Sequence, residues 1–508
     1  MDWLVHLPNW PLQPAIWPLY LTIVLVLYTT LRYTVTRCKA PTIKFNHYLP
    51  NFFNRLLYFI DAPGMIQYGY EKFAGMPFQI LKPDGNLIIL PPRYMEEFKN
   101  LPSSRISLLH AQHKNVLGEY VNILLDSELP AYTVTKKLTP ALNRIVPRTI
   151  NELQYAFPTV IPECKDRWVS VSLYEMILSI MSRTTSRIIV GDTLCRDERW
   201  LNLVIRYTNN IGVTIFLLRP FPKFLRPLMA KFLPSVWKLP KQLAYACDEF
   251  FLPMINERRH KERTDPNYKK PDDFMQWMMD SADNEYDKKP ETLTHGLMTI
   301  VALAAVHTST MLTTHAIYDL ILRPELLEPL REEIQETLKD GWENATQASF
   351  LAQRRLDSFL RESHRLNPTS EVTAQRIVRG EKLVLSDSFV LPKGSHICFP
   401  SGPMSRDEDI IPDAMIFDAF RWCRDPNSRN YLVTIDRTNM HFGYGRQACP
   451  GRFYAVSTIK AILSRFIMEY DFKFEKDLKK RPKNILNGDH IMPNMMTKVH
   501  IKERGVKI

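Results

Sequence analysis

The stretch from Glu291 to Pro324 constrains the fold more than any other part of the sequence. It reads ETLTHGLMTIVALAAVHTSTMLTTHAIYDLILRP, is apolar nearly all round and contains no proline before its last position. About 30 helical residues at a rise of 1.5 Å span about 45 Å, enough to cross a whole domain. A helix that is apolar on every side is buried rather than placed at a surface. We therefore expect a buried helix that crosses one large domain.

Small residues near the middle of this helix leave room on one face. Ala304, Ala305 and Thr308 share that face by helical spacing, so a large flat object could approach the backbone there. Thr308 would point its hydroxyl at that object, with His307 beside it. The alternative is a core threonine bonded to its own i−4 carbonyl, which is the commoner situation when nothing else is known. A second motif is needed to decide between the two interpretations.

Length, composition and local pattern together predict the fold class. A chain of 508 residues could form three or four domains, yet large single-domain enzymes reach the same size. Hydrophobic residues at 45% and charged residues at 24% predict a folded chain with a large core. Turn and strand signals flank Asp84-Gly85, helical patterns run to about residue 366, and short strands follow over residues 381–399. We therefore expect a mainly helical α+β fold with small sheets.

Charge and cysteine usage narrow the class of partner and the compartment. Lysine and arginine exceed aspartate and glutamate by 12, a bias toward nucleic acid, an anionic membrane surface or an acidic protein. The seven cysteines, at positions 38, 164, 195, 247, 398, 423 and 449, are scattered and form no CxxC pair. This pattern argues against a disulfide framework and a zinc site, and it indicates a reducing compartment.

The N-terminus predicts a membrane anchor over residues 1–35. No formally charged residue occurs from Leu7 to Leu31, basic residues follow at once, and only Asp2 precedes the segment. This length suits one membrane-spanning helix, and the positive charge after it places the rest of the chain in the cytosol. A cleaved signal peptide would carry its positive charge before the apolar run. The alternative is a buried core helix.

Residues 211–246 mix phenylalanine, leucine and tryptophan with basic residues and contain no acidic residue. Two interpretations are equally compatible with this composition. The segment could rest in the lipid headgroup region beside the anchor, or it could form a proline-broken helix pair that packs on the core.

A charged pair lies on a later helix. The stretch RRLDSFLRESHRLNP predicts a helix that ends at Asn367-Pro368 and carries Glu362 and Arg365 on one face. Arg421, in FDAFRW, is a candidate to complete a network with this pair through a bidentate guanidinium contact.

The segment HFGYGRQACPGRF, residues 441–453, holds a single thiol among glycines. Gly445 allows positive φ, and a helix is predicted to begin near Arg452, so Cys449 would lie at a helix N-terminus, where a thiolate is stabilised. A nucleophilic cysteine would need a histidine partner, and a phosphate-binding loop would need a Lys-Ser/Thr ending. As a metal ligand, one thiolate is sufficient as the axial ligand of a haem.

These motifs together resemble those of one enzyme family. The run Phe442-Gly-Tyr-Gly445-Arg446-Gln447-Ala-Cys449-Pro-Gly451 resembles the haem-binding signature of the cytochrome P-450 monooxygenases. Glu362-Ser-His-Arg365 and Phe420-Arg421-Trp422 are similar to two further elements of that family, and AAVHTS to its oxygen-activation segment. Order and spacing agree over essentially the whole chain. The wording of the motifs resembles filamentous-fungal enzymes of specialised metabolism, particularly those that oxidise terpenoid skeletons.

The resemblance implies a cytochrome P-450 fold, with residues 36–508 as the catalytic domain and haem b between the long helix and the cysteine loop. Cys449 would be the axial thiolate and metal ligand, with Phe442 packed near the sulfur. Gly445 and Gly451 would let backbone amides approach that sulfur. The resemblance also implies three residues that hold the fold around the haem: Glu362, Arg365 and Arg421.

Two positions depart from the family pattern. The family usually carries an acidic residue before the threonine that delivers protons, here Thr308, whereas this chain has His307, which titrates near neutrality and could relay protons differently. The position two before the ligand is commonly a basic residue that contacts a haem propionate, whereas this chain has Gln447. Other cofactor-binding candidates are implied by the resemblance: Arg446 in the same loop, and Arg376 and Lys136 or Lys137 for the propionates.

The resemblance also implies partners and a location. Electrons would come from NADPH through a membrane-bound reductase, with cytochrome b5 as a further donor. An acidic docking face on the reductase would meet basic residues near the thiolate. These residues are Arg446, Arg452, Lys460 and Arg465. The excess of positive charge is then explained by this partner, and no nucleic acid is needed. We expect a single-pass protein of the endoplasmic reticulum membrane whose apolar small-molecule substrate arrives from the lipid bilayer.

The expected reaction is hydroxylation, in one or several steps, of an apolar terpenoid or indole-terpenoid in a fungal biosynthetic pathway. Two alternatives remain open. One is a haem-thiolate desaturase or isomerase, and the other is a haem-binding membrane protein without turnover. The presence of Thr308 favours the hydroxylase.

Overall fold

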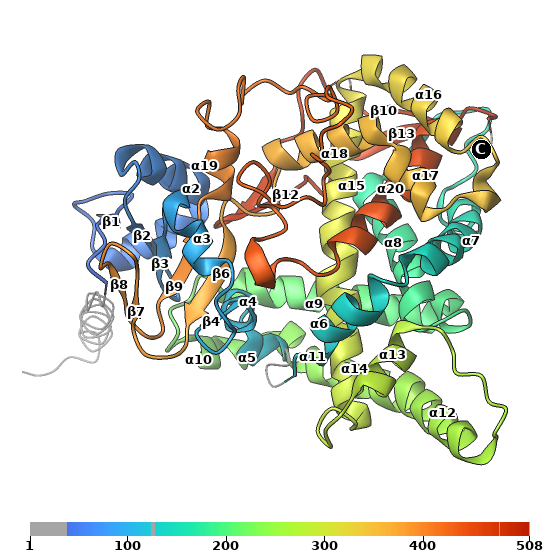
Figure 1. The fold of residues 1–508 in the computed structure, drawn as a ribbon, viewed down its shortest axis with the longest axis horizontal. Helices are drawn as coiled ribbons and strands as arrows, with labels where there is room; N and C mark the ends of the chain where they lie inside the picture. Colours follow the sequence, from blue (N-terminus) through green and yellow to red (C-terminus); the bar gives the residue numbers. More distant parts are fainter. Residues whose placement is uncertain (1–37, 123–126, 477, 507–508) are drawn as a thin grey trace, which may run out of the picture.

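The computed structural model describes residues 38–122, 127–476 and 478–506 (Figure 1). The anchor predicted over residues 1–35 lies outside them. Within the described ranges, helices form most of the molecule, and small sheets lie beside them. The expected mainly helical fold with small sheets is confirmed.

The largest sheet joins distant parts of the chain (Figure 1). Its strand order is β1 (Thr42–Ile43), β2 (Phe78–Lys82), β3 (Gly85–Ile89), β9 (His396–Phe399), β6 (Thr373–Val378) and β4 (Ile106–Ser107). The hairpin predicted around Asp84-Gly85 is confirmed, because β2 and β3 pair antiparallel with Lys82 opposite Gly85. Strand β9 pairs parallel with β3 and antiparallel with β6, so it joins the hairpin to the later strands.

Smaller sheets complete the β structure. One has the order β10 (Tyr470–Phe474), β13 (Lys498–Glu503) and β5 (Val169–Ser172). The others are the pairs β11 (Ile485–Asn487) with β12 (His490–Met492) and β7 (Leu383–Val384) with β8 (Val390–Leu391). The short strands predicted over residues 381–399 are therefore present as β7, β8 and β9.

The helices surround one central helix and form the main apolar core with it. The longer ones are α2 (Asn51–Lys72), α7 (Leu142–Val160), α8 (Leu173–Ile189), α9 (Glu198–Leu218), α11 (Pro234–Tyr245), α12 (Leu252–Thr264), α16 (Leu327–Thr337), α18 (Arg354–Leu366) and α20 (Arg452–Glu469). The shorter ones are α3 (Met95–Phe98), α4 (Leu108–Asn115), α5 (Gly118–Val121), α6 (Leu129–Thr133), α10 (Arg226–Ala230), α13 (Phe274–Ser281), α17 (Gln347–Ala352) and α19 (Ser401–Ser405).

The helix predicted from residue 291 is present and is interrupted by a π-helical segment. It consists of α14 (Pro290–Met298), the π segment Thr299–Ala305 and α15 (Val306–Ile321). Helix α15 packs against α8 and α18, and most of its residues are buried. A π segment inserts one extra residue into a turn and re-aims the side chains that follow it, and such segments occur often at functional sites. The segment ends three residues before Thr308.

Residues 211–246 form the helix pair that was one of the two alternatives, and placement in the lipid headgroup region stays a prediction. The segment forms the end of α9, then α10 and α11, and α9 and α11 pack against each other. Leu218 and Leu239 are fully buried, whereas Phe216, Phe232 and Trp237 are at least half exposed. The helix pair packs on the core and also presents large apolar side chains at the surface.

Two described helices are long and apolar enough to cross a membrane, namely α9 and the central helix Pro290–Ile321. Buried helices of globular proteins have the same length and composition, and both of these pack against other helices of the domain.

Candidate active site

Cys449 lies in the loop directly before α20. Its backbone N–H donates to the Phe442 carbonyl at 2.7 Å, which closes the loop, and α20 begins at Arg452 as predicted. Burial raises the pKa of the thiol, whereas the N–H groups of Gly451 and Arg452 and the Arg452 charge lower the pKa. The side chain is nevertheless exposed. A side chain that protein surrounds and that still has free surface can accept a bound group at that surface.

The glycines of this loop have different geometric roles. Gly445 has φ +67°, and a Cβ there would lie 2.4 Å from the Lys99 carbonyl oxygen, so only glycine fits. The close approach at Gly445 is therefore to the Lys99 backbone. The approach of its amide to the sulfur, which the resemblance implied, stays a prediction. Gly451 has an ordinary φ of −83° and contributes its N–H group at the sulfur.

Gln447 fastens the cysteine loop to the segment that contains β4. Its side-chain oxygen accepts from the Leu108 N–H at 2.9 Å, and its amide nitrogen donates to the carbonyls of Ile106 at 3.0 Å and Leu101 at 3.4 Å. The amide is occupied by backbone groups, so the side chain serves as a clamp between two loops.

Arg376, on β6, is a buried arginine beside the same loop. It donates to the carbonyls of Gln375, Tyr444 and Gln447, and it has no carboxylate partner among the described residues. Burial lowers the pKa of its guanidinium to about 10. An unpaired buried cation is costly, and an anionic group placed beside it would offset that cost. Lys136 and Lys137 are exposed.

Glu362 is the centre of a buried network that contains Arg365 and Arg421. Arg365 binds it bidentately at 2.7 and 2.9 Å, and Arg421 approaches at 3.2 Å. The Trp422 indole and the Asp418 N–H also donate to its carboxylate. Both arginines donate further to backbone carbonyls between residues 405 and 416. The network thereby fastens α18 to the irregular chain that leads toward the cysteine loop.

Thr308 is exposed, although it lies near the middle of the buried central helix. Its hydroxyl donates to the Ala304 carbonyl at 2.8 Å, and Ala304 is also exposed. The side chain thus makes the local i−4 hydrogen bond and also faces open space. Ala304 and Thr308 thus have free surface on the central helix, as Cys449 has in the loop before α20.

His307 faces α8. Its Nδ1 atom and the Tyr174 hydroxyl are 2.7 Å apart, and the rings stack at 6.2 Å. Burial lowers the pKa of His307 to about 4. The expectation that this histidine titrates near neutrality is therefore wrong, because the desolvated ring is neutral at physiological pH. Its Nε2 atom is buried and has no hydrogen-bond partner among the described residues.

The basic residues expected to dock a reductase are only partly available. Arg446 is exposed, and Arg452 is half-buried and donates to the carbonyls of Cys449 and Val433. Lys460 is buried and paired with Asp357 at 2.6 Å, and Arg465 is paired with Glu469 at 2.9 Å. The expectation is wrong for Lys460, because α20 turns this side chain into the core.

The donor set fits a haem. Such a group needs an axial thiolate with free surface, a cation for its propionates and small residues on the opposite side. Cys449 has the free surface, Arg376 is a buried cation without a carboxylate partner among the described residues, and Ala304 and Thr308 are small residues with free surface on the central helix.

Comparison with known proteins identifies the family. Residues 132–500 match the family model of cytochrome P-450. The chain belongs to this family, and it is a monooxygenase and therefore an oxidoreductase. Family members bind haem through a cysteine thiolate and receive electrons from a redox partner.

Curated relatives match over nearly the whole chain. The cytochrome P-450 monooxygenase paxP of Penicillium paxilli is 46% identical over 495 residues, which cover 97% of this chain and 96% of the relative. The monooxygenase penP of Penicillium crustosum is 46% identical over 92% of this chain and 91% of the relative. AtmP of Aspergillus flavus is 45% identical over 92% of this chain and 90% of the relative.

Several residues of the site were missed by sequence reasoning. Tyr174 is 133 residues from His307, and the backbone groups that Gln447 binds lie about 340 residues before it. Trp422 follows Arg421 directly in the motif FDAFRW, and its indole N–H is a hydrogen-bond donor. This position was the one signal in the sequence for a further partner of Glu362.

Proposed function

We propose that this chain is a membrane-anchored haem-thiolate monooxygenase that hydroxylates an apolar specialised metabolite, a terpenoid or indole-terpenoid of a fungal pathway. One observation carries the proposal: Cys449 and Thr308 are exposed inside an otherwise buried core. A cysteine and a threonine with free surface at the two predicted sides of the haem are what oxygen activation in this family requires.

Cys449 would hold the haem iron through its thiolate, and Arg376 would hold a propionate. Bound haem supplies the activation of dioxygen and the insertion of one oxygen atom into a C–H bond. The N–H groups of Gly451 and Arg452 donate to the ligand sulfur and lower the pKa of the thiol, against the larger effect of burial. Thr308 would carry on its hydroxyl the proton to be delivered. The hydrogen bond that this hydroxyl donates to the Ala304 carbonyl holds the side chain in position.

Gln447 and the Glu362 network would keep the ligand loop in place. Neither set has a side chain free to react, because backbone groups and arginines occupy their polar atoms. Both sets of contacts would limit movement of the ligand sulfur relative to the haem.

Electrons would reach the haem from NADPH through a membrane-bound reductase, with cytochrome b5 as a further donor. Arg446 and Arg452 lie beside Cys449 and would meet an acidic face of the partner. Residues 1–35 would anchor the chain in the endoplasmic reticulum membrane, with residues 36–508 as the catalytic domain.

The test is turnover of candidate scaffolds under labelled dioxygen. The full chain and a fungal NADPH-dependent reductase are expressed in yeast microsomes and supplied with terpenoid and indole-terpenoid substrates. We expect hydroxylated product that carries one labelled oxygen atom. Oxidised product without label would favour a desaturase or isomerase. A haem-thiolate spectrum without NADPH consumption on any of these scaffolds would favour the non-catalytic alternative.

A further inference from the structure

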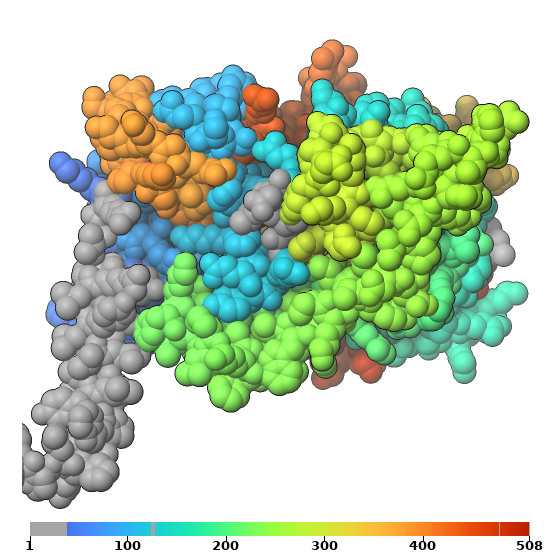
Figure 2. All heavy atoms as spheres, turned by 90° about the horizontal axis from the view of Figure 1, so that it is seen from below, coloured from blue at the N-terminus to red at the C-terminus, as the bar shows by residue number. Residues whose placement is uncertain are grey.

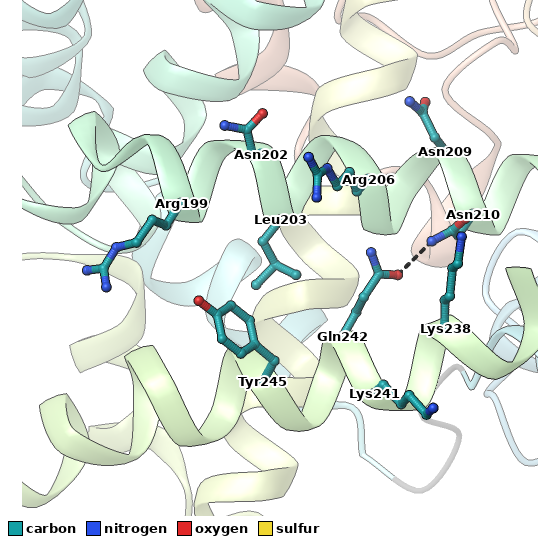
Figure 3. Close-up of a pocket in the computed structure, with 10 residues that line it drawn as sticks. All are labelled: Arg199, Asn202, Leu203, Arg206, Asn209, Asn210, Lys238, Lys241, Gln242 and Tyr245. Carbon is teal, nitrogen blue, oxygen red and sulfur yellow. Dashed lines mark hydrogen bonds between the residues drawn. The ribbon is translucent and has the colours of Figure 1, made fainter.

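A separate hollow lies on the outside of the domain, between α9 and α11 (Figure 3). The two helices run in opposite directions, and the hollow between them has a volume of about 730 Å³. Leu203 lies at its base, and a hydrogen bond of 2.8 Å between Asn210 and Gln242 joins its walls. We call this hollow the α9–α11 groove.

The lining of the α9–α11 groove contains four basic residues and no acidic residue. Arg199, at one end, is neutralised by Asp197 at 2.8 Å and by Glu249 at 3.0 Å. The other three, Arg206, Lys238 and Lys241, are exposed and have no acidic partner among the residues that the structure describes. Like charges without counter-ions raise the local positive potential and attract an anion.

Neutral hydrogen-bond donors lie among these charges. Asn202, Asn209 and Gln242 line the groove from both helices (Figure 3). Guanidinium, ammonium and amide groups all donate, and a phosphate offers several acceptor oxygens in return. The middle of the groove therefore has the chemistry of a phosphate site.

The same surface becomes apolar beyond the charges. Val213 and Phe216 follow Arg206 and Asn209 at helical spacing on one face of α9, and they are 46% and 54% exposed. On α11, Trp237 lies one turn before Lys241 and is 51% exposed. The α10 and α11 region is part of the outer surface of the molecule (Figure 2). An apolar rim therefore adjoins the basic groove.

We propose that the α9–α11 groove binds the phosphate of an anionic lipid, whose acyl chains lie along the rim of Val213, Phe216 and Trp237. A free phosphate would use the basic half alone, and an acidic protein would leave the apolar rim without a function. An anionic lipid uses both halves. The inference rests on the proposed membrane attachment for the source of the lipid and is separate from the oxidation of substrate.

The test measures binding of dioctanoyl phosphatidic acid, below its micelle concentration, to the full-length holoprotein in detergent. The groove variant is K238Q/K241Q, and the matched control K479Q/K480Q removes two exposed lysines between β10 and β11. We expect the groove variant to bind about tenfold more weakly and the control to bind like wild type. Dioctanoyl phosphatidylcholine should bind wild type at least about tenfold more weakly than phosphatidic acid does.

Two further arms test the source of the phosphate. F216Q should weaken phosphatidic acid binding and leave binding of glycerol 3-phosphate unchanged. Equal affinity for inorganic phosphate and phosphatidic acid would overturn the lipid assignment. Equal affinity of wild type and K238Q/K241Q would overturn the site. The carbon-monoxide difference spectrum of each variant shows whether the haem domain is intact, so failure of this proposal is distinguishable from failure of the proposed function.

Discussion

Tyr174 and His307 are joined by a hydrogen bond of 2.7 Å that links α8 to the central helix directly beside Thr308. At the position where the family usually has a carboxylate, this chain therefore has a neutral ring paired with a phenol. A neutral imidazole adds no charge beside the exposed Thr308 side chain. Any proton that passes this position moves along a neutral hydrogen-bonded pair.

The buried neutral state of His307 predicts a pH-dependent stability. The pKa falls from 6.5 when unfolded to about 4 when folded, so the unfolded chain binds a proton first as pH decreases. The contribution of neutral His307 to the free energy of unfolding is complete above pH 6.5 and is lost as pH falls toward 4. Between pH 7.5 and 5, wild type should lose about 2 kcal/mol that His307→Gln does not lose.

Urea unfolding at the two pH values measures this difference. His260→Gln is the matched control, because His260 is exposed on α12 and should change nothing. An identical loss of unfolding free energy in wild type and His307→Gln would contradict the assignment of a neutral buried His307.

Thr308 is the second target. Thr308→Ala removes the hydroxyl and should lower the product formed per NADPH consumed by about ten- to a hundredfold, with the electrons appearing as hydrogen peroxide. Thr308→Ser keeps the hydroxyl and should recover most of the coupling. Product and peroxide are measured together in the reconstituted system, and full coupling in Thr308→Ala would argue against a role in proton delivery.

Cys449→Ser should abolish the carbon-monoxide difference band that is characteristic of thiolate ligation, since a serine hydroxyl does not replace the thiolate. Cys423→Ser is the control, because Cys423 is only half-buried, lies in the loop before the ligand segment and bonds the Phe420 carbonyl. Retention of the band in Cys449→Ser would assign the ligand to another residue.

Gln447→Ala should loosen the ligand loop. It leaves the Leu108 N–H and the Ile106 carbonyl without a partner, which costs about 1–3 kcal/mol of unfolding free energy. Haem should also dissociate faster, as measured by transfer to apomyoglobin. Arg446→Ala, at the adjacent exposed position, should leave both quantities near wild type, and equal effects of the two variants would refute the clamp.

Glu362→Gln should be the most destabilising of these changes. It removes the negative charge between Arg365 and Arg421 and leaves two guanidinium groups without their counter-ion, at a cost of about 3–5 kcal/mol. Denaturant unfolding should show this loss, while Glu336→Gln on the exposed side of α16 should show none. A loss below 1 kcal/mol would mean that backbone carbonyls alone satisfy the arginines.

Local signals account for what the sequence predicted correctly. Asn367-Pro368 ends α18, Pro450-Gly451 precedes α20, and Asp84-Gly85 turns the first hairpin, as expected. Each of these signals acts within a few residues, because proline and glycine restrict or permit particular backbone angles. The helical spacing of Glu362 and Arg365 was readable for the same reason.

Long-range pairing accounts for what was missed. No periodicity in the sequence relates Tyr174 to His307 or Leu108 to Gln447, because the pairs meet only after the helices and loops have packed. The sequence suggested that Lys460 is a surface charge, whereas the orientation of α20 places it against Asp357. The π segment was also missed, because each of its residues, Thr299–Ala305, is compatible with an ordinary α-helix.

The order of strands in the largest sheet has a consequence during synthesis. Strand β3 pairs with β9, which the ribosome produces about 300 residues later. At about 5–20 residues per second, the β2–β3 hairpin therefore waits on the order of 15–60 s with an unpaired edge. Throughout that delay its apolar strands are open to association with other chains. A lower growth temperature and a larger supply of chaperones are therefore the first variables to adjust when the protein is produced.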